Sequence, residues 1–392
     1  MIKIYDTMTR SLRDFVPLTE NVVNMYVCGP TVYNYIHIGN ARSAVAFDTI
    51  RRYFEYCGYT VNYISNFTDV DDKIIKAANE AGISTKELSD KFIAAFMEDT
   101  GQLGIKPATQ NPRVINYMDE IIAFVSTLVD KGFAYVSEGD VYFRVAKSNN
   151  YAKLANKTLE DLEIGASGRT DAETERKENP LDFALWKAAK EGEVSWDSPW
   201  GPGRPGWHIE CSVMATEILG GTIDIHGGGA DLEFPHHTNE IAQSEAKTGK
   251  TFANYWMHNG FVNVDNEKMS KSLGNFVTVH DMLQTVDGQV LRFFLATQQY
   301  RKPINFTEKA IHDAEVNLKY LKNTHSLPLT EQVNQAELQT YLDAFQEAMD
   351  DDFNTANGVT VLFDMAKWIN SGNYDQTVKD AFEKMLQVFG IV

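Results

Sequence analysis

Two lysines, Lys268 and Lys271, lie three residues apart in the string Lys-Met-Ser-Lys-Ser, and Gly274 follows. Two ammonium groups on a short polar loop can neutralise the charge that builds on a triphosphate as the bond between its α- and β-phosphorus atoms breaks. A solvated basic turn is the general alternative for lysines. We favour the phosphate interpretation because a second phosphate-binding pattern, at His37, occurs earlier in the chain.

That second pattern is His37-Ile38-Gly39-Asn40, which follows a predicted strand and opens a predicted helix. The start of a helix after a parallel strand binds anions, because free backbone N–H groups point outward there. His37 can donate a hydrogen bond to a phosphate, and Gly39 lets a base or ribose come close because it has no side chain. Taken alone, the pattern is equally compatible with a surface turn.

Four further residues have side chains that suit a metal ion. Cys28 ends the first predicted strand, Cys211 lies at or near a predicted helix, and His236 and Glu240 are four residues apart on one helix face. Two cysteines, a histidine and a glutamate are suitable zinc ligands. They are far apart in sequence, so spacing alone leaves open the alternative of core cysteines and an exposed glutamate.

Other reactive side chains have simpler interpretations. Asp69, Asp71 and Asp72 could hold magnesium, but carboxylates at a helix N-terminus are the more common reason for such a cluster. Cys57 lies near the end of an apolar helix, so we expect it to be a buried hydrophobic residue. His237 is one residue off the face shared by His236 and Glu240, so we do not expect it to be a ligand.

The elements that must position these residues follow a repeating order. A predicted helix over 40–56 separates predicted strands at 22–27 and 59–65, which is a βαβ unit and implies a parallel sheet. Strands at 222–226, ended by three glycines, and at 252–259 restore this pattern, with a helix over about 234–246 between them.

Two regions do not fit the parallel sheet. Residues 116–205 contain a short predicted hairpin and read as an insertion between the two halves of the sheet. Residues 306–392 have apolar side chains at helical spacing on successive segments, which predicts a small helical bundle.

Composition limits the classes of protein. The chain has 392 residues, 43% of them hydrophobic, which predicts several domains with a large core. It has no apolar run long enough for a membrane helix and no N-terminal secretion signal, and its three cysteines suit a reducing compartment. We therefore expect a soluble cytoplasmic protein. The net charge of -18 argues against a nucleic-acid partner, unless a local surface is basic.

Together the motifs resemble a known family. The strings at 37–40 and 268–272 match the two signatures of class I aminoacyl-tRNA synthetases. Within that class, nearly the whole chain resembles the cysteinyl-tRNA synthetases, most clearly over 26–33, 66–73, 206–212 and 227–237.

The resemblance implies an α/β fold: a Rossmann-like parallel sheet domain split by an insertion, then a KMSKS-bearing stem-contact region and a C-terminal helical bundle. The implied divisions are residues 1–115 and 206–262 for the two halves of the catalytic domain, 116–205 for the insertion, 263–305 for the KMSKS region and 306–392 for the tRNA-binding bundle.

The resemblance also implies roles for single residues. One zinc ion per chain would be bound by Cys28, Cys211, His236 and Glu240. ATP, with Mg²⁺, would contact Gly29, Pro30, Thr31, His37, Gly39, Asn40, Gly228, Asp231 and Lys271. The amino acid would contact Gly29, Thr68, Trp207 and His226, and His37, Asn40, Lys268 and Lys271 would act in catalysis. For Trp207, ordinary core packing is the alternative.

The implied reaction joins cysteine to AMP and passes it to the 3′ end of tRNA(Cys). The expected partners are tRNA(Cys), L-cysteine and ATP, with no membrane, and we expect a monomer. Zinc would distinguish cysteine from serine, because a thiol ionises and binds zinc far more readily than an alcohol does. This would convert a small difference in size into a large chemical one.

Two departures and two rivals accompany this prediction. Asn40 stands where the first signature often has histidine, and the chain stops at Val392, which suggests a truncated or shortened member without the usual anticodon-contacting domain.

One rival is a ligase of the same fold that joins cysteine to an amino sugar, as in mycothiol synthesis. The other is a non-catalytic relative that binds nucleotide or RNA.

Overall fold

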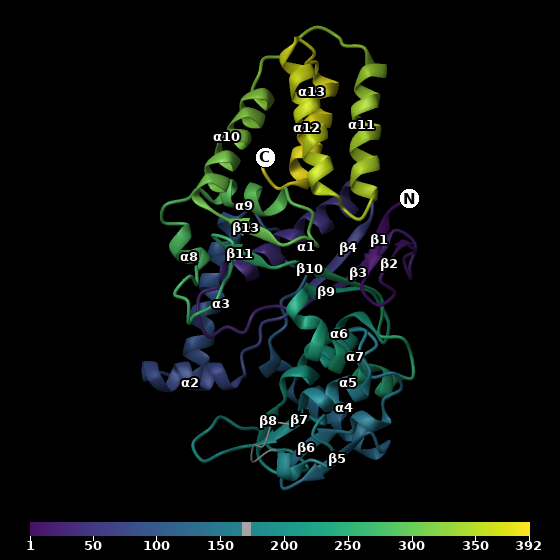
Figure 1. The fold of residues 1–392 in the computed structure, drawn as a ribbon, viewed down its shortest axis with the longest axis vertical. Coiled ribbons are helices and arrows are strands. Elements are labelled where there is room, and N and C mark those ends of the chain that lie inside the picture. The colour runs from purple at the N-terminus through teal and green to yellow at the C-terminus, as the bar shows by residue number, and fades with distance from the viewer. Residues whose placement is uncertain (167–173) are drawn as a thin grey trace.

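The protein is described by a computed structural model that covers residues 1–166 and 174–392. It is elongated, with a helical bundle at one end, a parallel sheet in the middle and a smaller antiparallel sheet at the other end (Figure 1). Part of the predicted insertion, residues 167–173, lies outside the described residues. The two outer parts therefore flank the sheet that carries the sequence motifs.

The central sheet confirms the predicted fold class. Its strands are β3 (Val22–Val27), β4 (Thr60–Ser65), β9 (Ile223–Gly229) and β10 (Ala253–Asn259), in the order β10-β9-β3-β4, and every neighbouring pair is parallel. Helix α1 (Ile38–Tyr56) connects β3 to β4, and α7 (Thr238–Thr248) lies between β9 and β10 in the chain. The strand order reverses between β3 and β9, where the two halves of the sheet meet.

One strand boundary differs from the prediction. The three glycines expected to end the strand are part of β9. A Cβ atom at Gly227 would lie 2.4 Å from the Phe47 ring of α1, so glycine lets this helix pack directly on the strand. Gly227 is therefore needed for helix–sheet packing rather than for a turn.

The insertion forms the second sheet. Strands β5 (Ala134–Ser137), β6 (Asp140–Phe143), β7 (Phe183–Ala188) and β8 (Gly203–Pro205) pair antiparallel in chain order. The helical segments near them are η1 (Val114–Tyr117), α4 (Met118–Asp130), η2 (Val145–Lys147), α5 (Leu159–Ala166), η3 (Thr174–Arg176) and α6 (Trp207–Leu219). Their apolar side chains share one buried cluster with the adjoining edge of the central sheet, including Ile209, Ile223 and Trp256.

Shorter elements surround the central sheet. An antiparallel hairpin, β1 (Lys3–Asp6) and β2 (Ser11–Asp14), precedes it, and Thr7 donates a backbone hydrogen bond of 2.9 Å to Trp256 of β10. After β4 come α2 (Asp72–Ala81) and α3 (Thr85–Gln102). The KMSKS string begins at the end of β12 (Glu267–Lys268), which pairs with β11 (Val262–Val264), and β11 pairs with β13 (Ile304–Phe306).

The predicted helical bundle consists of α10 (Glu308–His325), α11 (Gln335–Asp350), α12 (Thr355–Asn370) and α13 (Gln376–Val388). It follows two short helices, α8 (Val279–Met282) and α9 (Gly288–Ala296). Arg292 of α9 is fully buried, pairs with Asp48 of α1 at 2.6 Å and donates to the Phe389 carbonyl at 3.0 Å. This pairing ties the end of the bundle to the helix that begins at the His37 motif.

The prediction that Cys57 is buried is wrong. Cys57 is the C-cap residue of α1 and is exposed. The apolar face of α1 ends one turn earlier, at Tyr53 and Phe54, so the residue after the last helical turn faces solvent. Among the described helices, none is both long enough and apolar enough to cross a membrane.

Candidate active site and metal centre

A cavity of about 890 Å³ opens at the carboxyl ends of the parallel strands, beside the point where the strand order reverses. This is where ligands bind in open α/β sheets. Both sequence motifs reach this cavity although they are far apart in the chain. Its lining includes Cys28, His37, Asn40, Asp231, Lys268 and Lys271.

The first motif begins helix α1 with a reciprocal cap. His37 Nδ1 accepts hydrogen bonds from the backbone N–H groups of Gly39 at 3.0 Å and Asn40 at 3.3 Å, and Asn40 Oδ1 accepts from the His37 backbone at 3.2 Å. Because Nδ1 accepts, the proton of the neutral ring is on Nε2. Burial, helped by the nearby charges of Lys271 and Lys73, lowers the pKa of His37 to about 4. The ring is therefore a neutral donor at physiological pH.

The cap also explains how Asn40 can replace histidine. Its Oδ1 is used by the cap, and within the described part of the chain its Nδ2 has no hydrogen-bond partner. Asn40 lines the cavity, so this amide is left to donate to a ligand. A Cβ atom at Gly39 would lie 2.8 Å from the His37 ring, which is the close approach that glycine permits here.

The two lysines of the second motif lie at different places on the cavity wall. Lys268 Nζ is 5.8 Å from the centre of the Phe261 ring, and its charge acts on Asp231. Lys271 Nζ is 5.6 Å from the ring centres of both Tyr33 and Phe276. Both lysines are exposed, and no described carboxylate lies within ion-pair distance of either. They are free to bind anions.

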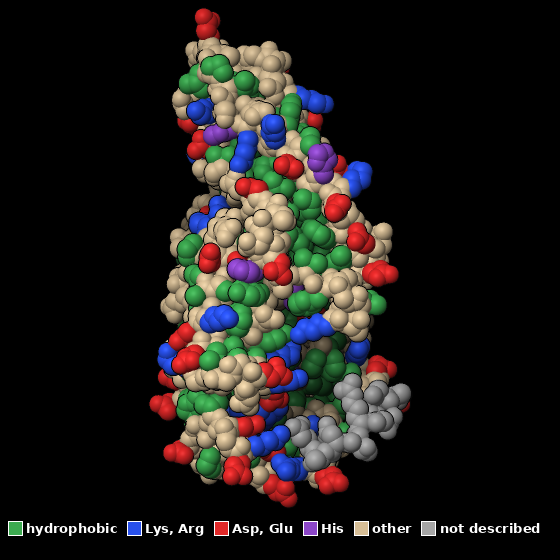
Figure 2. Space-filling view, turned by 90° about the vertical axis from the view of Figure 1, so that its left-hand side faces the viewer, with side chains coloured by type: hydrophobic (Ala, Val, Ile, Leu, Met, Phe, Trp, Pro, Cys, Tyr) green, Lys and Arg blue, Asp and Glu red, His purple; other side chains and the backbone are tan. Residues whose placement is uncertain are grey.

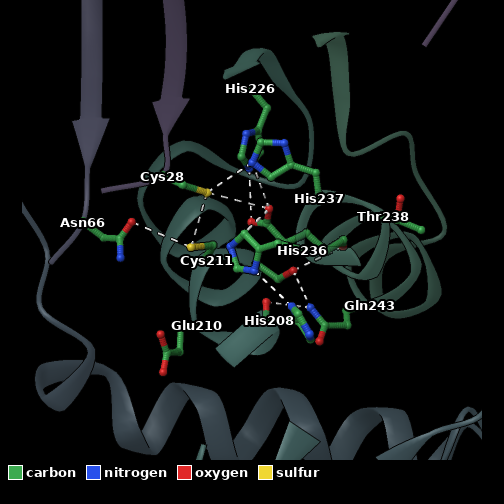
Figure 3. A network of polar contacts seen from close by, with 12 residues as sticks. Cys28, Asn66, His208, Glu210, Cys211, His226, His236, His237, Thr238 and Gln243 are labelled. Atoms are coloured by element: carbon green, nitrogen blue, oxygen red, sulfur yellow. Dashed lines mark hydrogen bonds and ion pairs between the residues drawn. The ribbon is translucent and has the colours of Figure 1, made fainter. Parts of the chain in front are cut away.

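The four predicted metal ligands meet in one place, and Figure 3 labels three of them, Cys28, Cys211 and His236. One ligand atom from each of Cys28, Cys211, His236 and Glu240 lies within 4.8 Å of the others. The two Sγ atoms are 3.7 Å apart, Cys28 Sγ is 3.9 Å from Glu240 Oε2, and His236 Nε2 is 3.8 Å from the same oxygen. The tertiary fold thus joins Cys28, directly after β3, and Cys211 of α6 with His236 of the short helical segment η5 (Glu233–His237) and Glu240 of α7.

These separations fit a tetrahedral zinc ion. With Zn–S bonds of about 2.3 Å, tetrahedral geometry places two sulfur ligands about 3.8 Å apart. Cys211, His236 and Glu240 are buried, whereas Cys28 is half-buried and lines the cavity. Burial, helped by Cys211 and Glu240, raises the pKa of the Cys28 thiol well above its usual value. A divalent cation reverses this preference, because it binds the thiolate.

A second set of possible ligands overlaps the first. His226 and His237 also lie within 4.8 Å of Cys28 and Glu240, and His237 Nε2 is 3.4 Å from Cys28 Sγ. This set replaces a thiol and His236 by two imidazoles. We favour the first set for zinc because it contains both thiols, whose spacing matches the tetrahedral edge.

The other histidines near this centre contact the ligands or one another. His226 Nε2 lies 3.1 Å from Glu240 Oε1, which leaves Oε2 facing the cysteines. His208 Nδ1 lies 3.0 Å from His236 Nδ1. His237 Nδ1 lies 2.8 Å from His258 Nε2. Such outer contacts orient metal ligands and fix their tautomers.

Trp207 stands at the entrance to this centre. Its ring stacks on His236 with a centroid separation of 4.2 Å and an interplanar angle of 16°. The side chain lines the cavity and keeps 40% of its surface exposed, which excludes ordinary core packing. It is placed between the cavity and the metal centre, beside any ligand that reaches His236.

Three residues expected to contact ligands do not line the cavity. His226 is fully buried behind Glu240, and Thr68 is buried and donates to Glu210 at 3.3 Å. Gly228 lies under Leu232 and His237, and Gly229 lines the cavity in its place. The other predicted contacts, Gly29, Pro30, Thr31 and Asp231, do line it.

The three aspartates after β4 do not form a cluster. Asp69 pairs with Arg113 at 2.9 Å, Asp72 pairs with Arg204, and Asp71 caps α2 by accepting from the Lys73 backbone. The helix-terminus explanation therefore holds for Asp71 and Asp72, the N-cap and first residue of α2, whereas Asp69 is held by Arg113.

The sequence did not single out several residues of the site. His208 and His258 support the metal centre, and Tyr33 and Lys73 line the cavity near Lys271. The sequence could have indicated His258, because this residue lies near the carboxyl end of a predicted parallel strand, where ligand sites form.

The face of the molecule that carries α2, α3 and α8 has both acidic and basic side chains (Figure 2). Figure 2 shows Lys and Arg side chains gathered around a hollow in the lower half of that face. The charge of -18 is an average over the whole chain, so it does not exclude a local site for an anion.

Comparison with known sequences identifies two families. Residues 14–316 match the family of tRNA synthetases class I (C) catalytic domain, and residues 344–392 match the DALR domain. Cysteine–tRNA ligase of Streptococcus thermophilus (strain CNRZ 1066) is 95% identical over all 392 residues, which cover 88% of that protein. The enzyme of the same name from Streptococcus pyogenes serotype M6 is 84% identical over the same shares.

Comparison with solved structures supports the fold. Methionyl-tRNA synthetase of Mycobacterium tuberculosis superposes with a TM-score of 0.66 at 15% identity, over 94% of this chain and 88% of that one. A leucyl-tRNA synthetase from Agrobacterium radiobacter K84 gives a TM-score of 0.69 at 10% identity, over 96% and 84%. At such identities the likeness shows the class I synthetase fold alone.

Proposed function

The chain belongs to the cysteine–tRNA ligase family of class I aminoacyl-tRNA synthetases, and on this premise we propose that it joins L-cysteine to tRNA(Cys) at the expense of ATP. The observation that carries the proposal is the meeting of Cys28, Cys211, His236 and Glu240 at one end of the cavity that also holds the His37 and Lys271 motifs.

The metal end would select the amino acid. Cys28, Cys211, His236 and Glu240 would hold zinc, and Trp207 would cover the substrate. A zinc ion held there supplies a Lewis acid that binds a thiolate, so cysteine is favoured over serine by sulfur chemistry rather than by size. Gly29, which ends the strand beside Cys28, brings backbone close to the substrate.

The phosphate end would promote adenylation. A carboxylate oxygen of cysteine attacks the α-phosphorus of ATP and forms the mixed anhydride. The bond from this phosphorus to the bridging oxygen breaks, and pyrophosphate leaves with the electron pair, accompanied by Mg²⁺. His37 Nε2 and Asn40 Nδ2 would donate to the phosphates. Lys271 would neutralise the charge that develops as the bond breaks.

The second step would transfer cysteine to tRNA. A terminal ribose hydroxyl attacks the carbonyl carbon of the adenylate, and AMP leaves. The bundle α10–α13 would contact the tRNA, since its last part matches the DALR domain. The buried ion pair between Arg292 and Asp48 would keep the bundle in a fixed position relative to α1.

Cysteine-dependent exchange between ATP and labelled pyrophosphate tests the first step. We expect exchange with cysteine. The ratio of the exchange rates with cysteine and serine should exceed about 10- to 200-fold, which is the selectivity of a pocket that distinguishes its ligands by size alone. Chelation of the metal should abolish the activity, and added zinc should restore it. Equal exchange with serine would overturn the proposed selection.

Charging assays test the second step. Labelled cysteine should be transferred to tRNA(Cys) and not to an amino sugar. Transfer to an amino sugar would support the rival ligase instead. Absence of any exchange would support the rival that is not catalytic.

A further inference from the structure

Three cations outside the two sequence motifs line the cavity: Arg51 and Lys106, which both pair with Glu55, and Lys73, which forms no ion pair with a described residue. Lys73 lies in the first turn of α2, lines the same cavity, and places its Nζ 5.5 Å from the centre of the Tyr33 ring. Lys271 Nζ lies 5.6 Å from the centre of that same ring. The phenol ring of Tyr33 is thus shared by two ammonium groups from segments far apart in sequence.

Lys73 has no carboxylate of its own, despite the acidic residues around it. Asp69 and Asp72 are paired with Arg113 and Arg204, and Asp71 is used to cap the helix. Within the described residues the Lys73 ammonium group forms no ion pair and no hydrogen bond, and its contact is with the Tyr33 ring. Its ammonium group is therefore not neutralised by the protein.

Two ammonium groups that share one ring repel each other unless an anion lies near both. The cation–π contact offsets only part of this repulsion, because such contacts stabilise by about 0.5–1 kcal/mol at exposed sites. His37 lies in the same region, because its ring is 5.2 Å from the ring of Phe276, and Lys271 Nζ is 5.6 Å from the centre of that Phe276 ring. A donor and two unpaired cations therefore converge on one part of the cavity.

The other lysine of the KMSKS string is not part of this group. Lys268 lies by Phe261 and Asp231, on the wall formed by β11 and the end of β9. The lysines thus form two separate positions. The position at Tyr33 has two cations and, among the residues that the structure describes, no carboxylate paired with either, and it suits the more highly charged part of a bound triphosphate.

From this geometry, and resting on the proposed function, we propose that Lys73 binds the β- and γ-phosphates of ATP together with Lys271 and retains contact with pyrophosphate as it leaves. The step itself is unchanged: the bond between the α-phosphorus and the bridging oxygen breaks, and pyrophosphate takes the electron pair. Lys73 contributes positive charge at the leaving group, where negative charge increases.

The test compares Lys73→Ala with Lys76→Ala, an exposed lysine one turn later on α2 that does not line the cavity. We expect Lys73→Ala to raise the KM for pyrophosphate in cysteine-dependent exchange by about 10- to 100-fold, as for loss of a hydrogen bond to a charged group. Lys73→Arg should retain most of the affinity. The KM for cysteine should stay unchanged in all three variants.

A direct binding measurement separates this inference from the proposed function. Calorimetric titration of magnesium pyrophosphate into wild-type protein and Lys73→Ala should show the same loss of affinity without any reaction. If wild type performed no exchange, the proposed function would fail, while the calorimetry would still decide the role of Lys73. Equal pyrophosphate binding by Lys73→Ala and Lys76→Ala would overturn the inference, as would a defect confined to the KM for tRNA.

Discussion

At the metal end of the cavity the functional side chains are buried and contact one another, whereas at the phosphate end they are exposed lysines without carboxylate partners among the described residues. His236 is held by His208 and Glu240 by His226, and Cys211 is buried beside Cys28. Lys73 and Lys271 contact only aromatic rings through their ammonium groups. The metal end is thus arranged before substrate binds, and the phosphate end is completed by the charge of the substrate.

This difference suits two tasks. Selecting a thiol requires ligands at fixed distances, which buried and mutually supporting side chains provide. Stabilising a leaving group requires charge that interacts most strongly during the reaction, which unpaired cations provide. Substitutions at the two ends should therefore separate metal content from catalysis.

The largest expected effect is loss of the metal end. Cys211→Ser should reduce bound metal to a small fraction of the wild-type content, because it removes a thiolate ligand. Cysteine-dependent exchange should fall by more than about 100-fold. Loss of a residue that only supports a metal ligand already lowers activity by up to that factor, and Cys211 is itself a ligand. Elemental analysis and the exchange assay measure both, with Cys57→Ser as the control at an exposed cysteine. Full metal content in Cys211→Ser would contradict the ligand set.

A large effect without metal loss is expected at the other end. Lys271→Ala should slow exchange by about 100- to 1,000-fold, as for removal of one group that stabilises transition-state charge. Its metal content should equal that of wild type. Lys319→Ala, at an exposed lysine of α10, serves as the control for loss of one positive charge. Normal exchange in Lys271→Ala would refute the assigned role.

An intermediate effect is expected at the support of the metal ligands. His226→Ala should weaken metal affinity by about 10- to 100-fold, because Glu240 loses its neighbour at Oε1. His226→Gln, which keeps a donor, should retain more of the affinity. Competition with a chromogenic chelator measures this directly. If both variants bound metal as wild type does, His226 would be a packing residue only.

The smallest expected effect concerns pH. The pKa of His37 is lowered to about 4 by burial and by Lys271 and Lys73, whereas an unfolded chain takes up this proton near pH 6.5. Acidification from pH 7 to pH 5 therefore favours the unfolded state by at most about 2 kcal/mol at this residue. His37→Asn, which can still cap the helix, should lose less stability over this range in urea unfolding. An equal loss would show that His37 is not buried as described.

The sequence predicted the central elements well because their patterns are local. Val22–Val27 and Thr60–Ser65 are short apolar runs bounded by breakers, and α1 between them has a regular apolar face. Single residues at element ends were less predictable. Cys57 is an apolar residue type, but its exposure depends on where the helix ends. Gly228 and Gly229 are identical neighbours, and only the structure shows that Gly229 is the one that lines the cavity.

The sequence by itself determined the chemistry available: two thiols, an imidazole and a carboxylate for a metal, and lysines with a histidine cap for phosphate. Residue types and short spacings carry that information. Only the tertiary structure decided which groups meet, since Cys28 and Glu240 come from opposite halves of a split sheet and Lys73 meets Lys271 across Tyr33. Such contacts depend on the register of distant elements, which no local pattern specifies.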